Sequence, residues 1–155
     1  MKLRPYAPAD QAVLADLWFA SWTSIGLESP VVTRAELAAR VPRELAGRWN
    51  VTVAEVDGRM VGFLALALTE HRLDQLFILP AAKGSGIGRA LLGVAKQQMP
   101  NGFWLATHPD NSRARAFYER HGMVHDLSDC AMEQDRARYV FPRGFHIGQD
   151  TKNGF

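Results

Sequence analysis

One stretch near the middle of the chain constrains the fold more than any other, because it joins an apolar run, a glycine-rich turn and a helical pattern. Residues 76–79 are all apolar, as in a buried strand, and Pro80 ends that strand because proline has no N–H for a sheet ladder. Glycine then occupies alternate positions, at Gly84, Gly86 and Gly88. Glycine allows backbone amides to approach another group closely. The stretch predicts a strand, a turn and a helix whose N-terminus presents N–H groups and a positive dipole end, which suits phosphate.

The spacing of these glycines narrows the kind of phosphate ligand. A dinucleotide fingerprint needs a third glycine where Arg89 stands, and a Walker A loop needs a Gly-Lys-Ser or Gly-Lys-Thr ending that the turn lacks. The spacing that fits is a basic or amide residue, two residues, glycine, one residue and glycine, with Lys83 first. This pattern resembles the coenzyme A pyrophosphate loop of the GNAT superfamily of acyl-CoA-dependent N-acyltransferases, in which Arg or Gln is usual at the first position. An ordinary glycine-rich strand–helix turn is the alternative.

A second stretch, residues 111–123, resembles the later motif of the same superfamily. In that motif Asn begins a helix and Phe-Tyr-Glu precedes a terminal glycine; here these are Asn111, residues 117–119 and Gly122. The stretch is also consistent with helix physics, because Asn is a good N-cap and glycine a good residue just past a helix C-terminus. Two motifs in the right order are more specific than either alone. The resemblance extends over residues 2–142.

The length of 155 residues is enough for one domain with a substantial core and too short for two. We expect a single N-acetyltransferase-like domain over residues 1–143 and a C-terminal tail or extension over residues 144–155. A net charge of +2 is too weak to indicate a nucleic-acid partner, and Cys130 stands alone, so no internal disulfide is possible. No apolar run approaches membrane-spanning length, and the chain begins without a signal-peptide pattern. We therefore expect a cytoplasmic protein without a membrane partner.

Periodicity and turn signals predict an alternating order of strands and helices. Residues 33–36 form a capping-box pattern before a helix that we expect Pro42 to bend or split, and Asp57 and Gly58 predict a tight hairpin turn. The expected strands are residues 2–6, 49–56, 59–68, 73–79, 103–107, 123–127 and 136–141, and helices are expected to begin near residues 9, 33, 87 and 111. This order predicts an α/β (α+β) fold, a mixed sheet flanked by helices. The GNAT resemblance further implies a mostly antiparallel central sheet whose splayed middle strands hold the pantetheine arm.

Acyl transfer to an amine requires hydrogen-bond donors at the thioester carbonyl, a neutral attacking nitrogen and an acid for the leaving thiolate. If Phe77, Ile78 and Leu79 splay away from the next strand, their backbone groups can bind the acyl carbonyl and the pantetheine amides. The alternative is ordinary sheet pairing. Backbone amides of the turn are expected to bind pyrophosphate, assisted by the two basic side chains. The residues expected there are Lys83, Gly84, Ser85, Gly86, Ile87, Gly88 and Arg89.

The catalytic groups are implied mainly by the resemblance. It makes Tyr118 the general acid that protonates the coenzyme A thiolate, and it makes Asn111 a contact of the cofactor arm. A core tyrosine with a satisfied hydroxyl is the alternative for Tyr118. Asp74, just before the apolar run, is our candidate base, unless water serves or the amine arrives neutral. Weaker candidates for the base are Glu70, His71 and His108. The histidines show no metal-ligand spacing, so no metal is predicted.

Trp22 and Ser21 lie on a predicted helix that borders the acceptor site in GNAT proteins, so we expect both to contact the substrate. Core packing is the alternative for the tryptophan. The sequence predicts an N-acetyltransferase that moves acetyl from acetyl-CoA to a small-molecule or peptide amine by direct attack in a ternary complex. A non-catalytic acyl-CoA-binding or regulatory module on the same fold is the alternative. Exposed edge strands are compatible with a homodimer.

Overall fold

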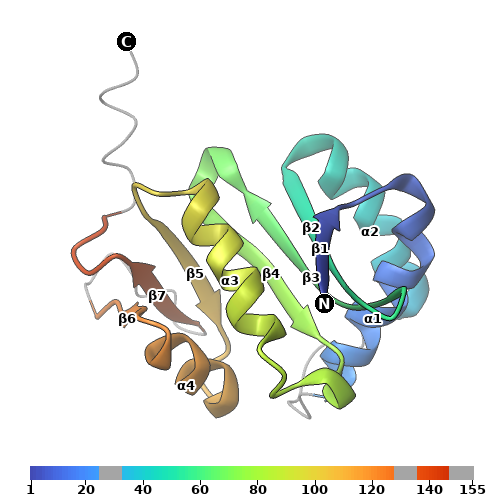
Figure 1. Ribbon diagram of the computed structural model, residues 1–155. Helices are drawn as coiled ribbons and strands as arrows, with labels where there is room; N and C mark the ends of the chain where they lie inside the picture. Colours follow the sequence, from blue (N-terminus) through green and yellow to red (C-terminus); the bar gives the residue numbers. More distant parts are fainter. Residues whose placement is uncertain (25–32, 128–135, 147–155) are drawn as a thin grey trace.

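The computed structural model describes residues 1–24, 33–127 and 136–146, without the side chains of residues 21, 22 and 24. These segments build one seven-stranded sheet in the order β1-β2-β3-β4-β5-β7-β6, with helices on both faces (Figure 1). The strands are β1 (Lys2–Pro5), β2 (Trp49–Val56), β3 (Arg59–Ala67), β4 (Arg72–Ile78), β5 (Phe103–Thr107), β6 (Val124–His125) and β7 (Ala137–Phe141). The α-helices are α1 (Gln11–Ser24), α2 (Arg34–Gly47), α3 (Ile87–Gln98) and α4 (Ser112–Arg120). The mixed, mostly antiparallel sheet predicted from the sequence is confirmed.

Two apolar layers cover the two faces of the sheet. The first packs α3 and α4 against the strands, with Leu91 and Tyr118 facing Phe103. The second packs α1 and α2, with Trp18 6.4 Å from Phe63 between ring centroids. Alternation along a strand divides β4 between the layers, because successive side chains point to opposite faces. Those in the first layer are Leu76 and Ile78, and those in the second are Phe77 and Leu79.

The helix α2 begins as the sequence predicts and continues where the sequence predicts a break. Thr33 accepts the Glu36 N–H at 3.1 Å and the Glu36 carboxylate accepts the Thr33 N–H at 3.0 Å, which is a capping box. The expectation that Pro42 splits this helix is wrong, since α2 runs unbroken through it. Proline leaves the carbonyl four residues earlier without a helix donor. That carbonyl, of Ala38, instead lies 3.5 Å from the Gln11 side-chain amide of α1.

The hairpin between β2 and β3 is confirmed as a two-residue turn. Both turn residues have positive φ, 52° at Asp57 and 74° at Gly58, and they connect the paired residues Val56 and Arg59. This is the pattern of a type I′ turn, whose twist matches that of the strands. The turn thereby holds β2 in register with β3, and β3 is the neighbour of β4.

The parallel strands β4 and β5 meet at one end and then separate. Their ladder consists of the pair Arg72 and Trp104 within the described residues, with the Trp104 N–H donating to the His71 carbonyl at 2.9 Å. A β-bulge at Asp74 accompanies the separation, because the register with β3 shifts by one residue there. Bulges bend and twist a strand. The splayed middle strands implied by the family resemblance are therefore present.

The first residues of the predicted tail are packed onto the domain. The Phe145 N–H donates to the Pro142 carbonyl at 3.0 Å, and the Phe145 ring lies over Gly102, where a side chain would collide with it. Residues 144–146 thus continue directly from the domain, residues 147–155 lie outside the described part of the chain, and the tail or extension stays a prediction. None of the described helices is both long and apolar enough to cross a membrane.

Candidate active site

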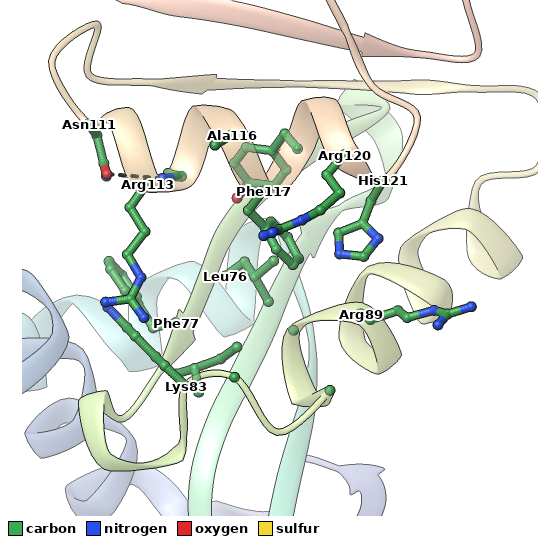
Figure 2. A pocket seen from close by; sticks show the side chains of 16 residues that line it. Leu76, Phe77, Lys83, Arg89, Asn111, Arg113, Ala116, Phe117, Arg120 and His121 are labelled. Atoms are coloured by element: carbon green, nitrogen blue, oxygen red, sulfur yellow. Dashed lines mark hydrogen bonds between the residues drawn. The ribbon is translucent and has the colours of Figure 1, made fainter.

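A cavity of about 730 Å³ opens between α4, the glycine-rich loop and the strand β4 (Figure 2). It lies on the face of the sheet that carries α3 and α4, beside the point where β4 and β5 separate. Its lining residues are Leu76, Phe77, Ile78, Lys83, Gly84, Gly86, Gly88, Arg89, Asn111, Arg113, Ala114, Ala116, Phe117, Tyr118, Arg120 and His121. The two stretches singled out in the sequence therefore form two walls of one cavity.

The glycine-rich loop needs glycine for two different reasons. Gly84 and Gly86 have φ of +85° and +84°, a left-handed conformation that other residues adopt at a cost. A Cβ on Gly88 would lie 2.9 Å from Ile78 Cδ1 and 3.1 Å from the Phe117 ring. Gly86 is the N-cap of α3 and provides no side-chain cap, so the first N–H groups of the helix point out of its end. The loop thus has the open backbone and dipole end that suit an anion.

Three residues expected at the cofactor site do not line the cavity. The hydroxyl of Ser85 donates to the Ala82 carbonyl, and the Ile87 side chain is buried in the core. The N–H of Leu79 donates to the Val61 carbonyl at 2.8 Å, so the expectation that this group is available to a ligand is wrong. The reason is the strand register, which sequence alone does not give.

The hydrogen-bond register between β3 and β4 shows that Leu76, and not Leu79, presents its backbone groups on the side of β4 that faces β5. In an antiparallel ladder, residues alternate between hydrogen-bonding to the partner strand and pointing the other way. Leu79 bonds to β3, and Phe77 stands opposite Phe63 in the same phase. The backbone groups of Leu76 and Ile78 therefore point toward the β5 side, where the strands separate. The ladder thus adds Leu76, which the sequence did not single out, as a residue that presents backbone groups at this edge.

Positive side chains stand at both ends of the cavity. Figure 2 shows Lys83 and Arg113 reaching toward one another at one end, and Arg120 and His121 extending from the last turn of α4 at the other. Burial lowers the pKa of Lys83, and the charge of Arg113 lowers it further. Within the described residues, the side chains of Lys83 and of the arginines lining the cavity form no hydrogen bond and no ion pair. An anion entering the cavity would meet uncompensated positive charge.

Tyr118 is buried, with 8% of its surface exposed, and its ring packs 5.3 Å from Phe117 between centroids. Its hydroxyl has no hydrogen-bond partner in the described part of the chain. Burial raises the pKa of Tyr118, so the phenol is protonated at neutral pH. Asn111 caps α4 by accepting the Ala114 N–H at 3.2 Å and also lines the cavity. Tyr118 therefore lines the cavity with a hydroxyl that no described residue occupies.

The structure places the candidate base Asp74 outside the cavity, in an ion-pair network. Its carboxylate accepts from Arg48 at 3.0 Å and from the Trp49 indole at 2.6 Å, and Arg72 Nε lies 3.3 Å from it. The carboxyl side chain is only 7% exposed. These partners hold the carboxylate on the far side from the cavity lining, where it has no route to an amine bound there. The arrangement gives Asp74 a structural role and does not support the catalytic one.

The weaker candidates for the base also lie outside the cavity. Glu70 pairs with Arg48 at 3.0 Å, and His71 follows β3 in a left-handed turn. The Nδ1 of His108 accepts the Asp110 N–H at 3.1 Å, which leaves the proton of the neutral ring on Nε2. No group of three or more potential metal ligands occurs among the described residues.

The side chains of Ser21 and Trp22, predicted to contact the acceptor, lie outside the described part of the chain. Sequence reasoning missed several residues that do line the cavity. Three of them, Arg113, Phe117 and Arg120, are spaced by four and three positions, and this spacing places them on one face of α4. Applying that rule to the helix after Asn111 would have found them.

A mixed sheet that opens between two parallel strands, with an anion-suited loop beside the opening, defines the acyltransferase class of fold. The model of the acetyltransferase (GNAT) family matches residues 13–123, and the chain belongs to this family. The family resemblance stated from the sequence is confirmed.

Known proteins support the same assignment. The PaiA N-acetyltransferase of Thermoplasma acidophilum, solved in complex with coenzyme A, is similar in fold with a TM-score of 0.73 at 20% identity, covering 90% of this chain and 96% of that one. An acetyltransferase of Thermus thermophilus gives a TM-score of 0.72 at 22% identity, covering 91% and 96%. The peptidyl-lysine N-acetyltransferase YiaC of Escherichia coli is 31% identical over 83 residues, 54% of each chain. The chain thus spans about half the length of this curated relative.

Proposed function

We propose that the protein transfers the acetyl group of acetyl-CoA to a primary amine by direct attack within a ternary complex. The observation that carries the proposal is the cavity itself. It joins an anion-suited loop, uncompensated cations, a splayed strand edge and an unpartnered tyrosine hydroxyl in one space. Acetyl-CoA combines a polyphosphate with a thioester on a long amide-containing arm. For each of these parts of acetyl-CoA, one side of the cavity carries groups of suitable charge or hydrogen-bonding capacity.

The residues of the cavity match the chemical parts of the cofactor. The amides at the start of α3 and the left-handed glycines suit the pyrophosphate, with Lys83 beside them. Leu76 directs its backbone groups toward the gap, where the pantetheine amides and the acyl carbonyl would lie. Acetyl-CoA supplies the activated acyl group, and the chain holds its carbonyl and its sulfur.

The proton balance of the reaction requires a donor near the sulfur. The amine nitrogen forms a bond to the acyl carbon, the carbon–sulfur bond breaks, and the proton lost by nitrogen is matched by one gained at sulfur. The Leu76 N–H stabilises the carbonyl oxygen as negative charge develops. Tyr118 donates its hydroxyl proton to the leaving thiolate. A phenol is a weaker acid than a thiol, and burial raises the pKa of Tyr118 further, so the transfer is completed only as the phenolate regains, through water, the proton that the nitrogen releases.

The acceptor is a primary amine of a small molecule or a peptide. None of the four carboxylates and imidazoles considered as bases lines the cavity, so we propose that the amine enters neutral or loses its proton to water. YiaC acts on peptidyl lysine by its name. A lysine-containing peptide is therefore the first acceptor to test. A homodimer and a cytoplasmic location stay predictions.

The test of this function is thiol release from acetyl-CoA with a panel of amines. We expect turnover with at least one amine. Replacing the hydroxyl in Tyr118→Phe should lower kcat by about 10²-fold to 10⁴-fold, the usual contribution of an acid–base group, while acetyl-CoA still binds.

Tyr139→Phe is the matched control. The Tyr139 hydroxyl also lies in the protein interior, but it accepts from Arg115 at 3.0 Å and donates to Glu119 at 2.7 Å, away from the cavity. This change should reduce stability and leave kcat unchanged. Binding of acetyl-CoA without turnover of any amine would favour the non-catalytic module. Equal effects of the two tyrosine changes on kcat would remove the catalytic role of Tyr118.

A further inference from the structure

The face of the sheet opposite to the cavity carries a polar side chain that has no role in the fold. Gln75 of β4 pairs with Ala65 of β3, and directly paired residues point to the same face. Ala65 belongs to the second apolar layer, so the Gln75 side chain lies on that face as well. It is half-buried, and its amide forms no hydrogen bond with any described residue. Polar groups in such positions usually have a partner, so this amide is available to a ligand.

The bulge in β4 sets the position of Gln75 beside β5. Arg72 and Trp104 are the paired residues of the two strands, and the extra residue of the bulge brings Gln75 level with Ala106. Because Leu105 lies in the first layer, alternation directs Ala106 to the second face. An alanine therefore stands on each neighbouring strand at the level of Gln75. These short side chains leave space around the Gln75 amide where β4 and β5 separate.

The gap between β4 and β5 connects this face with the cavity. Phe77, two residues after Gln75, belongs to the second layer and also lines the cavity. Trp18 of α1 lies 6.5 Å from Phe77 between ring centroids, and its indole N–H is buried without a hydrogen-bond partner in the described part of the chain. Such an N–H costs about 1–3 kcal/mol unless water or a ligand bonds to it. Two unsatisfied polar groups therefore lie near Phe77 on the second face.

The direction of attack on the thioester follows from how the gap is filled. Acetyl-CoA would occupy the cavity on the side of α3 and α4, and the Leu76 backbone would hold its acyl carbonyl from the edge of β4. The acyl carbon then stays open toward the second face, where Gln75 lies. A neutral primary amine has a lone pair for the attack and N–H groups that donate hydrogen bonds. The side-chain carbonyl of a glutamine accepts such a bond and does not take the proton.

Resting on the proposed acetyl transfer, we infer that Gln75 is an acceptor-binding residue on the second face of the sheet. Its side-chain carbonyl accepts an N–H of the neutral amine, and this hydrogen bond directs the nitrogen lone pair toward the acyl carbon in the gap. The nitrogen forms its bond to that carbon as the carbon–sulfur bond breaks, and the proton that it releases passes to water. The site thus selects the neutral form of the amine.

The titratable groups of the second face do not supply a base to this site. The Asp74 carboxylate bonds to Arg48, just before β2, so it is directed away from β5. His108, just after β5, accepts the Asp110 N–H with Nδ1, which leaves the proton of the neutral ring on Nε2. The side chains level with Gln75 on β3 and β5 are alanines, which do not titrate. Cations packed on indole rings complete the charged groups considered on this face: Arg40, Arg72 and Arg138.

The pH dependence of thiol release tests this role, with the amine varied at saturating acetyl-CoA. In the wild type, kcat/KM for the amine should rise with pH up to the pKa of the amine, and a second amine of different pKa should move that rise. Gln75→Ala should lower this kcat/KM about threefold to tenfold, as expected for one hydrogen bond, without changing KM for acetyl-CoA. Gln75→Glu places a carboxylate base at the same position, so the rise should move to lower pH. A purely structural glutamine would not move it.

Gln97→Ala is the matched control, since Gln97 is an exposed glutamine of α3 without a partner among the described residues. It should leave both kinetic constants unchanged, and thermal unfolding checks that every variant is folded. The role of Gln75 would be overturned by an unchanged kcat/KM in Gln75→Ala, by an unmoved rise in Gln75→Glu, or by a wild-type rise at one pH for all amines. Each of these results leaves the proposed function standing. No turnover of any amine would overturn the proposed function as well.

Discussion

Two groups of arginines in this protein have opposite surroundings. Arg4 lies 2.8 Å from Asp10 and 2.7 Å from Glu55, and Arg48 bonds to Glu44 at 2.9 Å and to Asp74 at 3.0 Å. The arginines that line the cavity have no such partner among the described residues. The first group joins strands and helices of the N-terminal half, and the second faces the space between α3 and α4. The same side chain thus joins secondary-structure elements in one region, and we propose that it binds a ligand in the other.

This difference shows that the number of ion-pair partners of an arginine distinguishes a structural role from a binding role, which the residue type alone does not. A charge pair removed from water is costly to break, because the remaining partner is left without compensation. An exposed and unpaired arginine loses little when it is removed, unless its partner is a ligand. Mutations in the paired group should therefore change stability and leave binding intact, and mutations in the unpaired group should do the reverse.

Asp74→Ala should give the largest effect on stability. It removes the partner of Arg48 and of the Trp49 indole at a site where the carboxyl is 7% exposed. We expect a loss of about 3 kcal/mol in the free energy of unfolding, measured by urea denaturation, with acetyl-CoA affinity and kcat per folded molecule unchanged. The control Arg113→Ala should change stability by less than about 0.5 kcal/mol and weaken cofactor binding. A loss of kcat in folded Asp74→Asn would restore this residue as a base.

Gly86→Ala should weaken cofactor binding more than it lowers stability, because it changes the backbone of the glycine-rich loop. A side chain at φ +84° strains the turn and alters the path of the amides at the start of α3. Acetyl-CoA affinity should fall about tenfold or more, measured by calorimetry, with a stability loss of about 1 kcal/mol. Gly47→Ala is the control, since this helical glycine has open space around its Cβ position and no positive φ. An unchanged affinity in Gly86→Ala would show that the loop does not hold the phosphates.

Asp10→Asn should give the smallest change among these predictions, a loss of stability that depends on pH. Hydrogen bonds from Arg4 lower the pKa of Asp10 against the opposing effect of burial. A carboxyl with a lowered folded-state pKa stabilises the protein above its unfolded pKa and loses that contribution as pH falls through the folded value. Asp10→Asn should therefore be about 1 kcal/mol less stable than wild type at pH 7, and the gap should narrow as the pH falls from the unfolded-state pKa through the lower folded-state pKa of Asp10. A gap that stays constant with pH would assign the effect to packing.

Local signals determined most of the fold. The capping box at Thr33, the turn at Asp57 and Gly58, and the N-cap at Asn111 each depend on residues within a few positions, and each is predictable from them. The family pattern likewise located the loop and Tyr118. The prediction for Pro42 is wrong because its compensating donor comes from another helix.

The candidate site required tertiary information that no local pattern contains. The sequence suggests Asp74 as a base because it lies just before the apolar run, and its hydrogen-bond partners Arg48 and Trp49 are too distant in sequence for that pattern to show them. The choice between Leu79 and Leu76 at the strand edge depends on the register with β3 and on the bulge. The side chains of Arg89, Lys96 and Arg120 come close together only because the end of α4 packs against α3.

Thermal unfolding of the wild-type protein with acetyl-CoA, with NAD and with ATP tests most directly that the unpaired cations bind this cofactor. At about 100 times its dissociation constant, acetyl-CoA should add roughly 2.7 kcal/mol to the free energy of unfolding and raise Tm by several degrees. Arg113→Ala and Arg120→Ala should each reduce that rise, and Asp74→Ala should retain it. No rise with acetyl-CoA, or a larger one with NAD or ATP, would contradict the assignment of the cavity.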